Sequence, residues 1–257
     1  MATGSEVHKA MILAAGEGTR LRPLTLKTPK VLLPVGSDKP LIGYILSWLK
    51  NYDITEVIIN LHHMGDKIKG FLGDGSRFGV KVFYSPEETI LGTAGGVKRT
   101  EHFFNSTFVV VYGDVLTDFD LRDMIQFHWE RKAMATLAIL EVPNPLDVGI
   151  VEINRQGKIQ SFVEKPPRGS ETGNLGNGGV YVLERDILDY VPSEVSSDFA
   201  NDIFPELIEL HLPIYGYVLK PEDYLIDIGT IEKYQKANED VRAGKVKIRY
   251  EGQGCIS

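Results

Sequence analysis

Short apolar runs alternate with segments of helical spacing through the first half of the chain. The runs that predict buried strands cover residues 10–13, 57–61, 80–84 and 108–112. Between them, one predicted helix has an apolar face made of Leu41, Ile42, Ile45, Leu46 and Leu49, and residues 64–72 and 121–129 are further candidate helices. Strands that alternate with helices favour right-handed crossovers and a mainly parallel sheet with helices on both faces.

The pattern changes after residue 133, where predicted strands follow one another without helices between them. These strands cover residues 135–142, 149–154 and 158–164, and Gln156-Gly157 predicts a hairpin turn. Residues 166–178 are rich in Pro, Gly, Ser and Thr and predict a loop. Further strands are expected at 179–183, 214–218 and 224–227, and helices at 203–210 and 231–243. The expected fold class is α/β: a mainly parallel sheet flanked by helices, with a small antiparallel appendage.

Composition and charge narrow the classes of partner. The chain has 43% hydrophobic residues, enough for a buried core, and a formal net charge of −7. A negative protein is a poor partner for nucleic acid or an anionic membrane, so we expect neither. No apolar run approaches the roughly 20 residues that span a bilayer. The first nine residues lack the apolar core of a signal peptide, and Cys255 is the single cysteine, so a cytoplasmic location is expected.

The strongest motif is a glycine-rich string directly after the first predicted strand, Leu13-Ala14-Ala15-Gly16-Glu17-Gly18-Thr19-Arg20. Small residues at a strand exit let the backbone approach a polyphosphate and direct its N–H groups at the oxygens. Leu21 stands where a dinucleotide fingerprint needs a third glycine, and the Gly-Lys-Ser/Thr of a Walker loop is missing. Arg20 would bind phosphate in a bidentate manner and Lys30 would add a point charge. Two cations in one short loop disfavour the alternative of a structural turn.

These motifs resemble the sugar-phosphate nucleotidylyltransferases, the Rossmann-like enzymes that make NDP-sugars, and most closely the mannose-1-phosphate guanylyltransferases. The family pattern Gly-x-Gly-Thr-Arg-x-x-Pro-x-Thr, followed by Pro-Lys-x-Leu-x-Pro-Val, is present at residues 16–25 and 29–35. Further family strings follow in order: Leu-Gly-Thr-Ala-Gly at 91–95, Gly-Asp at 113–114, Phe-Val-Glu-Lys-Pro at 162–166, Asn-x-Gly-x-Tyr at 177–181 and Asp-Ile-Gly-Thr at 227–230. Their order and spacing over nearly the whole chain make the resemblance specific.

The resemblance implies transfer of a nucleoside monophosphate from an NTP to a sugar 1-phosphate with release of pyrophosphate, GTP and mannose 1-phosphate being the preferred pair. The alternatives are thymidylyl or uridylyl transfer to glucose 1-phosphate, guanylyl transfer to heptose 1-phosphate, and a non-catalytic regulatory homologue. A catalytic domain is expected over residues 1–244, with the antiparallel appendage binding the sugar, and an extended tail over residues 245–257. Many such guanylyltransferases continue into a hexapeptide-repeat β-helix, and no such repeat is present here. Assembly, as a homodimer, would then use the surface of the catalytic domain.

Two aspartates lie at the ends of predicted strands, where open α/β sheets bind ligands: Asp114 follows residues 108–112, and Asp227 ends the strand at 224–227. Two carboxylates from distant segments suit Mg²⁺, which takes few protein oxygens plus substrate phosphates, and the family uses this pair for the metal. The attacking phosphate is already ionised at neutral pH, so catalysis needs positioning and charge instead of a general base. The resemblance assigns catalytic roles to Arg20, Lys30, Asp114, Lys165 and Asp227.

The resemblance also divides the binding residues between the two substrates. It assigns nucleotide binding to Leu13, Ala14, Ala15, Gly16, Gly18, Thr19, Arg20, Lys30, Glu87, Gly92 and Thr93. It assigns sugar-phosphate binding to Gly149, Glu164, Lys165, Asn177 and Gly179. Ser85-x-Glu87 is the form associated with guanylyl enzymes, whereas Ile90 departs from the proline that many of them carry. His62-His63 has no acidic or cysteine partner at metal-ligand spacing, so packing or a local hydrogen bond is expected there.

Overall fold

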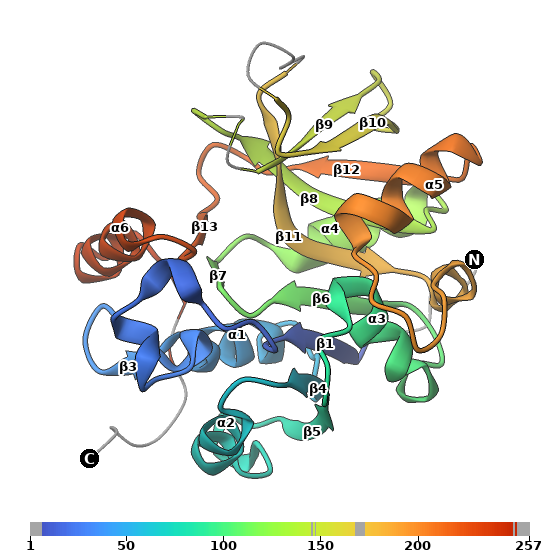
Figure 1. Ribbon diagram of the computed structural model, residues 1–257. Helices are drawn as coiled ribbons and strands as arrows, with labels where there is room; N and C mark the ends of the chain where they lie inside the picture. Colours follow the sequence, from blue (N-terminus) through green and yellow to red (C-terminus); the bar gives the residue numbers. More distant parts are fainter. Residues whose placement is uncertain (1–6, 145, 147, 168–172, 249, 251–257) are drawn as a thin grey trace. The chain divides into compact units, whose positions relative to one another are not determined.

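The computed structural model describes residues 7–144, 146, 148–167, 173–248 and 250 (Figure 1). Contacts divide the chain into two compact units. The first unit consists of residues 7–90, 111–119 and 222–250, and the second of residues 91–110 and 120–221. The expected α/β class is confirmed, because parallel strands and helices alternate along the chain. Among the described residues, no helix has both the length and the apolar character that crossing a membrane would need.

Parallel strands form the centre of the first unit (Figure 1). β4 (Glu56–Leu61) lies between β1 (Lys9–Leu13) and β5 (Lys81–Pro86), and both neighbours run parallel to it. Two helices connect these strands, α1 (Leu41–Lys50) and α2 (Gly65–Leu72). Every residue of α1 except the last is buried. The sequence predicted burial of only one apolar face, so the buried surface of the helix is larger than expected. Its apolar residues therefore pack on every side.

Two small antiparallel pairs complete the first unit. β7 (Val115–Thr117) pairs with β13 (Leu225–Asp227) so that Asp227 lies opposite Val115, and β2 (Pro34–Val35) pairs with β3 (Lys39–Pro40). The sequence pattern predicted the strand at 224–227 but not the other three, which are too short to show a period. The β7–β13 pair holds the end of β13 beside residue 114.

The C-terminal part of the first unit is fixed to its beginning. α6 (Ile231–Arg242) is held at the β2–β3 turn, where Asn238 Oδ1 accepts from Gly36 N at 2.9 Å and Arg242 Nε donates to Gly36 O at 2.7 Å. The ring of Tyr250 lies over Gly43, where a Cβ atom would be 2.4 Å from the tyrosine oxygen. The expected division into residues 1–244 and a tail stays a prediction, yet Tyr250 packs on the unit.

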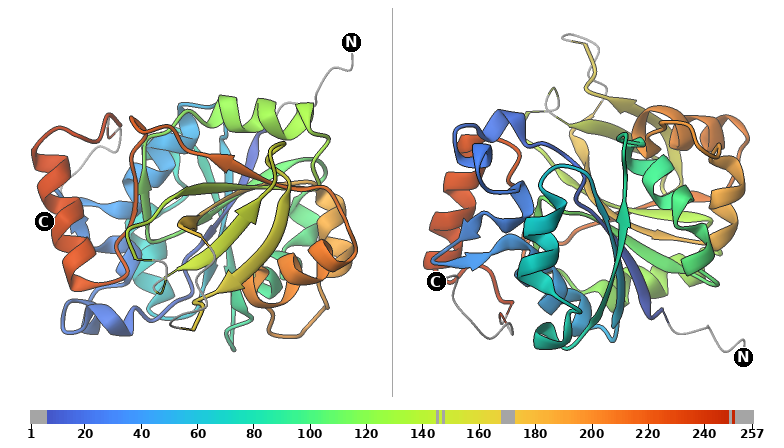
Figure 2. Two further views of the ribbon diagram at one scale, coloured as in Figure 1. Left: turned by 90° about the horizontal axis from the view of Figure 1, so that it is seen from above. Right: turned by 60° about the horizontal axis from the view of Figure 1, so that its bottom comes forward.

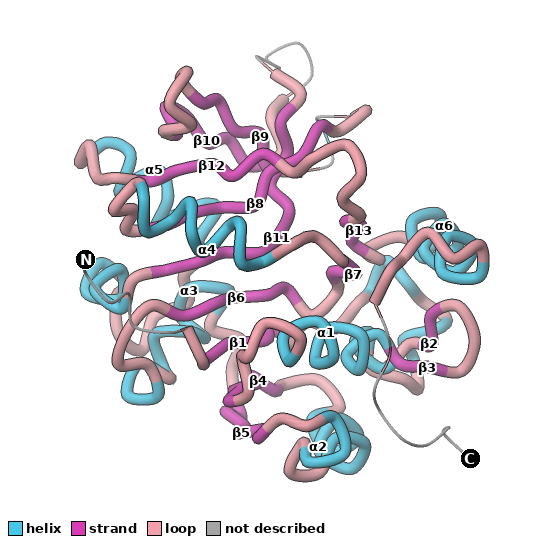
Figure 3. Tube along the Cα trace, turned by 180° about the vertical axis from the view of Figure 1, so that it is seen from behind, coloured by secondary structure: helices cyan, strands magenta, loops and turns pink. Residues whose placement is uncertain are grey.

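The second unit contains a mixed set of strands (Figure 3). β8 (Ala135–Glu141) lies between β11 (Leu175–Leu183), which is antiparallel to it, and β12 (Ile214–Val218), which is parallel. β9 (Gly149–Ile153) and β10 (Ile159–Glu164) form the antiparallel hairpin that the sequence predicted, drawn in yellow in Figure 2. Its turn contains Gly157 with a φ of +81°. The antiparallel appendage is therefore present in this unit.

One boundary in the second unit was predicted wrongly. β11 begins at Leu175, inside the segment expected to be a loop over 166–178, so Asn177 lies on a strand. The glycine-rich composition of this segment is typical of a loop. In the structure Gly176 is required by packing, because a Cβ atom there would lie 2.6 Å from the side chain of Val142. The glycine there serves close packing between strands and not a turn. Residues 168–172 of the expected loop lie outside the described residues.

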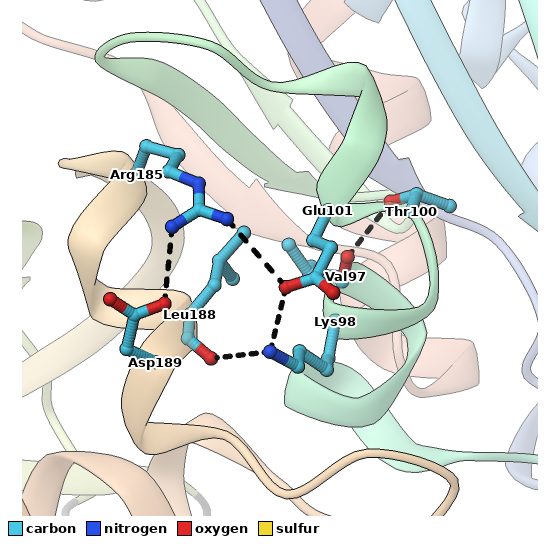
Figure 4. A network of polar contacts seen from close by, with 7 residues as sticks. All are labelled: Val97, Lys98, Thr100, Glu101, Arg185, Leu188 and Asp189. Atoms are coloured by element: carbon cyan, nitrogen blue, oxygen red, sulfur yellow. Dashed lines mark hydrogen bonds and ion pairs between the residues drawn. The ribbon is translucent and has the colours of Figure 1, made fainter.

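The helices of the second unit are α3 (Gly92–Arg99), α4 (Leu121–Glu130) and α5 (Phe204–Glu209), the last preceded by a π-helical turn at Phe199–Ile203. β6 (Phe108–Tyr112) begins in this unit and ends in the first. At the end of α3, the ammonium group of Lys98 lies between the carboxylate of Glu101, at 2.7 Å, and the carbonyl of Leu188, at 3.1 Å (Figure 4). This contact fixes α3 to the 3-10 segment Arg185–Tyr190.

Candidate active site

The glycine-rich segment after β1 folds into short 3-10 turns at Thr19–Leu21, Leu24–Leu26 and Lys30–Leu32. Gly18 has a φ of +65°, and its carbonyl accepts from Thr25 Oγ1 at 2.8 Å. A Cβ atom on Gly18 would lie 3.0 Å from the Thr25 methyl group and 3.2 Å from Lys30 Cβ. Glycine is therefore required here both by its backbone conformation and by the close return of the loop.

Asp114 follows β6 in the chain and lies close to the end of β1. Gly113 N donates to the carbonyl of Leu13 at 2.9 Å, so the residue before Asp114 is fixed to the start of the glycine-rich loop. The Asp114 carboxylate forms an ion pair with the ammonium group of Lys30, and the two side chains are 22% and 14% exposed. The predicted loop lysine and the predicted metal ligand are thus in direct contact.

Asp227 is brought to the same place from the far end of the chain. Ile228 N donates to the carbonyl of Asp114 at 2.8 Å. The Oδ1 atom of Asp227 accepts from Gly229 N at 3.0 Å, and its Oδ2 atom lies 2.5 Å from Lys233 Nζ. A Cβ atom on Gly229 would lie 3.1 Å from a guanidinium nitrogen of Arg20. The first unit thus brings together four of the five predicted catalytic residues: Arg20, Lys30, Asp114 and Asp227.

The chemistry of this cluster fits a divalent cation that uses few protein ligands. Asp114 and Asp227 each have a lysine ammonium group on Oδ2, so both carboxylates already face positive charge. The part of the chain that the structure describes contains no group of three or more His, Cys, Asp or Glu side chains suited to a metal. A cation here would therefore be held by the two aspartates and by substrate oxygens, as Mg²⁺ commonly is.

A second polar chain connects the loop to Glu87. Ala14 N donates to Asn60 Oδ1 at 2.7 Å, and Asn60 Nδ2 donates to Glu87 Oε1 at 2.9 Å. Both side chains are buried, Asn60 at 2% and Glu87 at 5% exposure. His62 Nδ1 lies 2.9 Å from the carbonyl of Glu87, which is the local hydrogen bond expected for the histidine pair. Sequence reasoning missed Asn60, although an asparagine within the apolar run of β4 was the available signal.

In the second unit, the start of α3 is bonded to the segment before the π-helical turn. Gly92 has a φ of +77°, and a Cβ atom there would lie 2.4 Å from the carbonyl oxygen of Ser197. Thr93 donates to Asp198 Oδ1 from its backbone N at 3.0 Å and from Oγ1 at 2.9 Å. These protein contacts account for Gly92 and Thr93 locally, and their nucleotide contacts stay predictions. Asp198 was not identified from the sequence, where it belongs to no motif.

Three of the predicted sugar-phosphate residues lie together at the end of the β9–β10 hairpin. Gly149 pairs with Glu164 in the strand register, and a Cβ atom on Gly149 would lie 2.6 Å from Glu164 Oε2. Burial raises the pKa of the Glu164 carboxyl above its ordinary value; Lys165 opposes this shift and Asp198 adds to it. The Lys165 side chain is 61% exposed, and its Nζ lies 3.8 Å from Glu164 Oε1. The hairpin end thus carries a cation beside a partly buried carboxylate.

The remaining two sugar-phosphate candidates lie on β11 of the same unit. Asn177 Nδ2 donates to the hydroxyl of Tyr181 at 2.8 Å, and Asn177 Oδ1 accepts from Gly179 N at 3.2 Å. The pairing of β11 with β8 shifts register between Asn177 and Tyr181, and Gly179 has a φ of +72°. The Asn-x-Gly-x-Tyr motif therefore encodes an irregularity in the strand that fixes the Asn177 amide.

A glycine-rich loop that carries two cations lies beside two aspartates from distant segments, an arrangement typical of α/β proteins that bind phosphate groups. The chain matches the nucleotidyl transferase family over residues 9–244 and belongs to that family. The resemblance of its motifs to this class of enzyme is confirmed.

Relatives within the family differ in the base that they use. The chain is 37% identical over 253 residues to the UTP–glucose-1-phosphate uridylyltransferase of Synechocystis sp., an alignment covering 93% of this chain and 64% of the relative. It is 34% identical over 240 residues to the mannose-1-phosphate guanylyltransferase of Mycobacterium tuberculosis, covering 91% and 65%. A Bacillus anthracis protein assigned as a glucose-1-phosphate thymidylyltransferase, solved with sucrose, is similar in structure, with a TM-score of 0.81, 29% identity and coverage of 91% and 95%.

Proposed function

We propose that this chain transfers a nucleoside monophosphate from an NTP to a sugar 1-phosphate. The observation that carries the proposal is the cluster in the first unit, where two aspartates and the cations Arg20, Lys30 and Lys233 lie around the exit of β1. Family membership supports the same reaction. A sugar-phosphate oxygen would form a bond to the α-phosphorus as the bond to the bridging oxygen of the β-phosphate breaks. Pyrophosphate leaves with that electron pair.

The residues of the first unit would act on the nucleotide by charge and position. Both reactants are polyanions, so the backbone N–H groups of the loop, Arg20 and Lys30 would neutralise and orient the triphosphate. Asp114 and Asp227 would hold Mg²⁺, which when bound stabilises the charge that develops on the phosphate oxygens. No proton has to be removed from the attacking phosphate, which is already ionised at neutral pH.

The second unit would bind the sugar 1-phosphate through the hairpin end. Lys165 would pair with the phosphate, and Glu164 would accept a hydrogen bond from a sugar hydroxyl. Gly149 leaves the space in which the Glu164 carboxylate lies, as the 2.6 Å approach shows. Asn177 would add an amide whose orientation is fixed by Tyr181.

For the base we propose guanine, because of the Glu87 carboxylate. A carboxylate only accepts hydrogen bonds, and guanine presents two adjacent donors, N1–H and N2–H. Uracil and thymine present a single N3–H between two carbonyl oxygens, which a carboxylate would repel. Asn60 connects Glu87 to the loop through bonds of 2.9 and 2.7 Å, so the acceptor has a fixed place relative to Ala14. Mannose 1-phosphate is the proposed acceptor, in line with the guanylyltransferase resemblance.

Uridylyl transfer to glucose 1-phosphate is the second candidate, favoured by the 37% identity with the Synechocystis enzyme. A pyrophosphate-release screen of GTP, UTP, dTTP, CTP and ATP against a panel of sugar 1-phosphates separates the two. GTP with mannose 1-phosphate should give the highest kcat/KM. A higher value for UTP with glucose 1-phosphate would contradict the base assignment, and no release with any pair would contradict the transfer reaction.

A matched pair of variants tests the role of Glu87. Glu87→Gln should reduce kcat/KM for GTP relative to UTP by about tenfold or more, because an amide cannot accept from both guanine donors. Glu88→Gln removes the same charge from the neighbouring, exposed side chain and should leave that ratio unchanged. Equal effects of the two substitutions would remove Glu87 from base selection.

A further inference from the structure

Lys233 occupies a defined position in the first turn of α6. Its backbone N donates to Oγ1 of the N-cap residue Thr230 at 3.3 Å, which fixes the start of the helix. From this turn the side chain extends back to Asp227, and its Nζ lies 2.5 Å from Oδ2. No sequence motif discussed above includes Lys233.

The ion pair is more accessible to solvent than the neighbouring Lys30–Asp114 pair. The Lys233 and Asp227 side chains are 32% and 31% exposed, whereas Lys30 and Asp114 are 14% and 22% exposed. Asp227 Oδ1 also accepts from Gly229 N at 3.0 Å, whereas Oδ2 is the oxygen that contacts Lys233. A divalent cation bound through Oδ2 would compete with the Lys233 ammonium group, because both are positive and would lie side by side on one oxygen.

We propose that Lys233 is a positioning residue that occupies the place of the divalent cation on Asp227 while the protein is free of nucleotide. This inference rests on the proposed function, in which Asp114 and Asp227 hold Mg²⁺. The lysine keeps the Asp227 carboxylate oriented and neutralised before the substrates bind. The cation that enters must displace it, so Lys233 lowers the affinity of the nucleotide-free protein for metal. Metal would then be taken up mainly together with the triphosphate, whose oxygens supply the remaining ligands.

The test is a Mn²⁺ titration of the full chain without nucleotide, followed by the electron paramagnetic resonance signal of free Mn²⁺. K233M should bind Mn²⁺ about fivefold or more tightly than wild type, because the repulsion between a unit charge and a divalent cation about 4 Å apart is worth about thirtyfold in water and salt reduces it. K236M is the matched control, since Lys236 lies on the same helix and pairs with Asp240 instead. It removes the same net charge and should leave the affinity within about twofold of wild type. K233R keeps the charge and should bind as weakly as wild type.

Each alternative outcome has a distinct meaning. Equal Mn²⁺ affinity of K233M and wild type, with thermal unfolding showing both folded, would overturn the role of Lys233 while leaving the metal site in place. Equal tightening in K233M and K236M would also overturn it, because the gain would then follow net charge alone. If D227N binds Mn²⁺ as wild type does, the carboxylate is no metal ligand, and the metal assignment fails together with the inference.

Discussion

Gly92→Ala tests whether the Leu-Gly-Thr-Ala-Gly motif is required first by the fold of the second unit. Gly92 lies at a φ of +77°, and the Cβ atom of an alanine would lie 2.4 Å from the carbonyl oxygen of Ser197. That carbonyl also accepts hydrogen bonds from Ala94 N at 2.9 Å and Gly95 N at 3.1 Å. Relief of the clash by movement of Ser197 would therefore lengthen both bonds at the start of α3.

The expected cost is the sum of two effects. An alanine in the left-handed region costs about 1–2 kcal/mol. Weakening the two backbone hydrogen bonds costs about 1–3 kcal/mol more. The free energy of unfolding should therefore fall by about 2–5 kcal/mol, and at about 2–4 °C per kcal/mol the Tm should fall by about 4–20 °C.

Urea denaturation followed by circular dichroism measures this change, with Gly70→Ala as the control. Gly70 lies within α2, and nothing lies within 4 Å of the position of an added Cβ atom. Alanine there should stabilise the protein by about 0.5–1 kcal/mol, because it lowers the entropy cost of helix formation. The two Gly→Ala changes should thus have opposite signs.

A Gly92→Ala protein whose free energy of unfolding is within about 1 kcal/mol of wild type would refute this reasoning. The combination of unchanged stability with a raised KM for the NTP would show that Gly92 serves the nucleotide and that the Ser197 contact yields at little cost.

The remaining predictions concern catalysis, pH and the tail. Asp227→Asn should lower kcat about a thousandfold with the fold intact in circular dichroism, and more than a tenth of wild-type activity would remove it from the proposed metal site. Lys165→Ala should raise KM chiefly for the sugar 1-phosphate, whereas Arg20→Ala should impair NTP use and kcat together; equal effects of the lysine variant on both substrates would contradict this division. Because burial raises the pKa of Glu164, acidification should protonate it earlier than an ordinary glutamate and raise KM for the sugar 1-phosphate, an effect that Glu164→Gln should lose. A chain ending at Gly244 should keep its kcat but lose about 1 kcal/mol of stability in urea denaturation, since it lacks the half-buried ring of Tyr250; loss of activity would show that the tail does more.

The tail prediction follows from how Tyr250 packs. Its ring makes edge contacts with Tyr44 at 5.0 Å and Phe78 at 6.0 Å between centroids, and Lys39 Nζ lies 5.2 Å from its centroid. Gly43 leaves the space that the ring fills. The sequence predicts only an extended tail over residues 245–257, because an alternating five-residue segment does not reveal which surface it covers.

The sequence by itself determined the features that depend on neighbouring residues. The apolar runs placed β1, β4 and β6, since a buried strand needs continuous apolar side chains. The glycine-rich string located the tight loop after β1, because residues such as Gly18 meet a backbone requirement within a few positions. This dependence on neighbouring residues also explains the error at β11. Gly176 is required by packing against another strand, but from its neighbours alone it is indistinguishable from a loop glycine.

Only the tertiary structure decided which of these residues meet. Asp227 is more than a hundred positions from Asp114, and they become neighbours because β13 pairs with β7. Asn60 joins the loop to Glu87, and Lys233 lies on Asp227, although neither stands in a recognisable motif. A sequence motif reflects the backbone conformation and the charges required within a short segment. The residues that contact this segment from elsewhere in the fold are determined by strand pairing and packing, which have no fixed spacing in the chain.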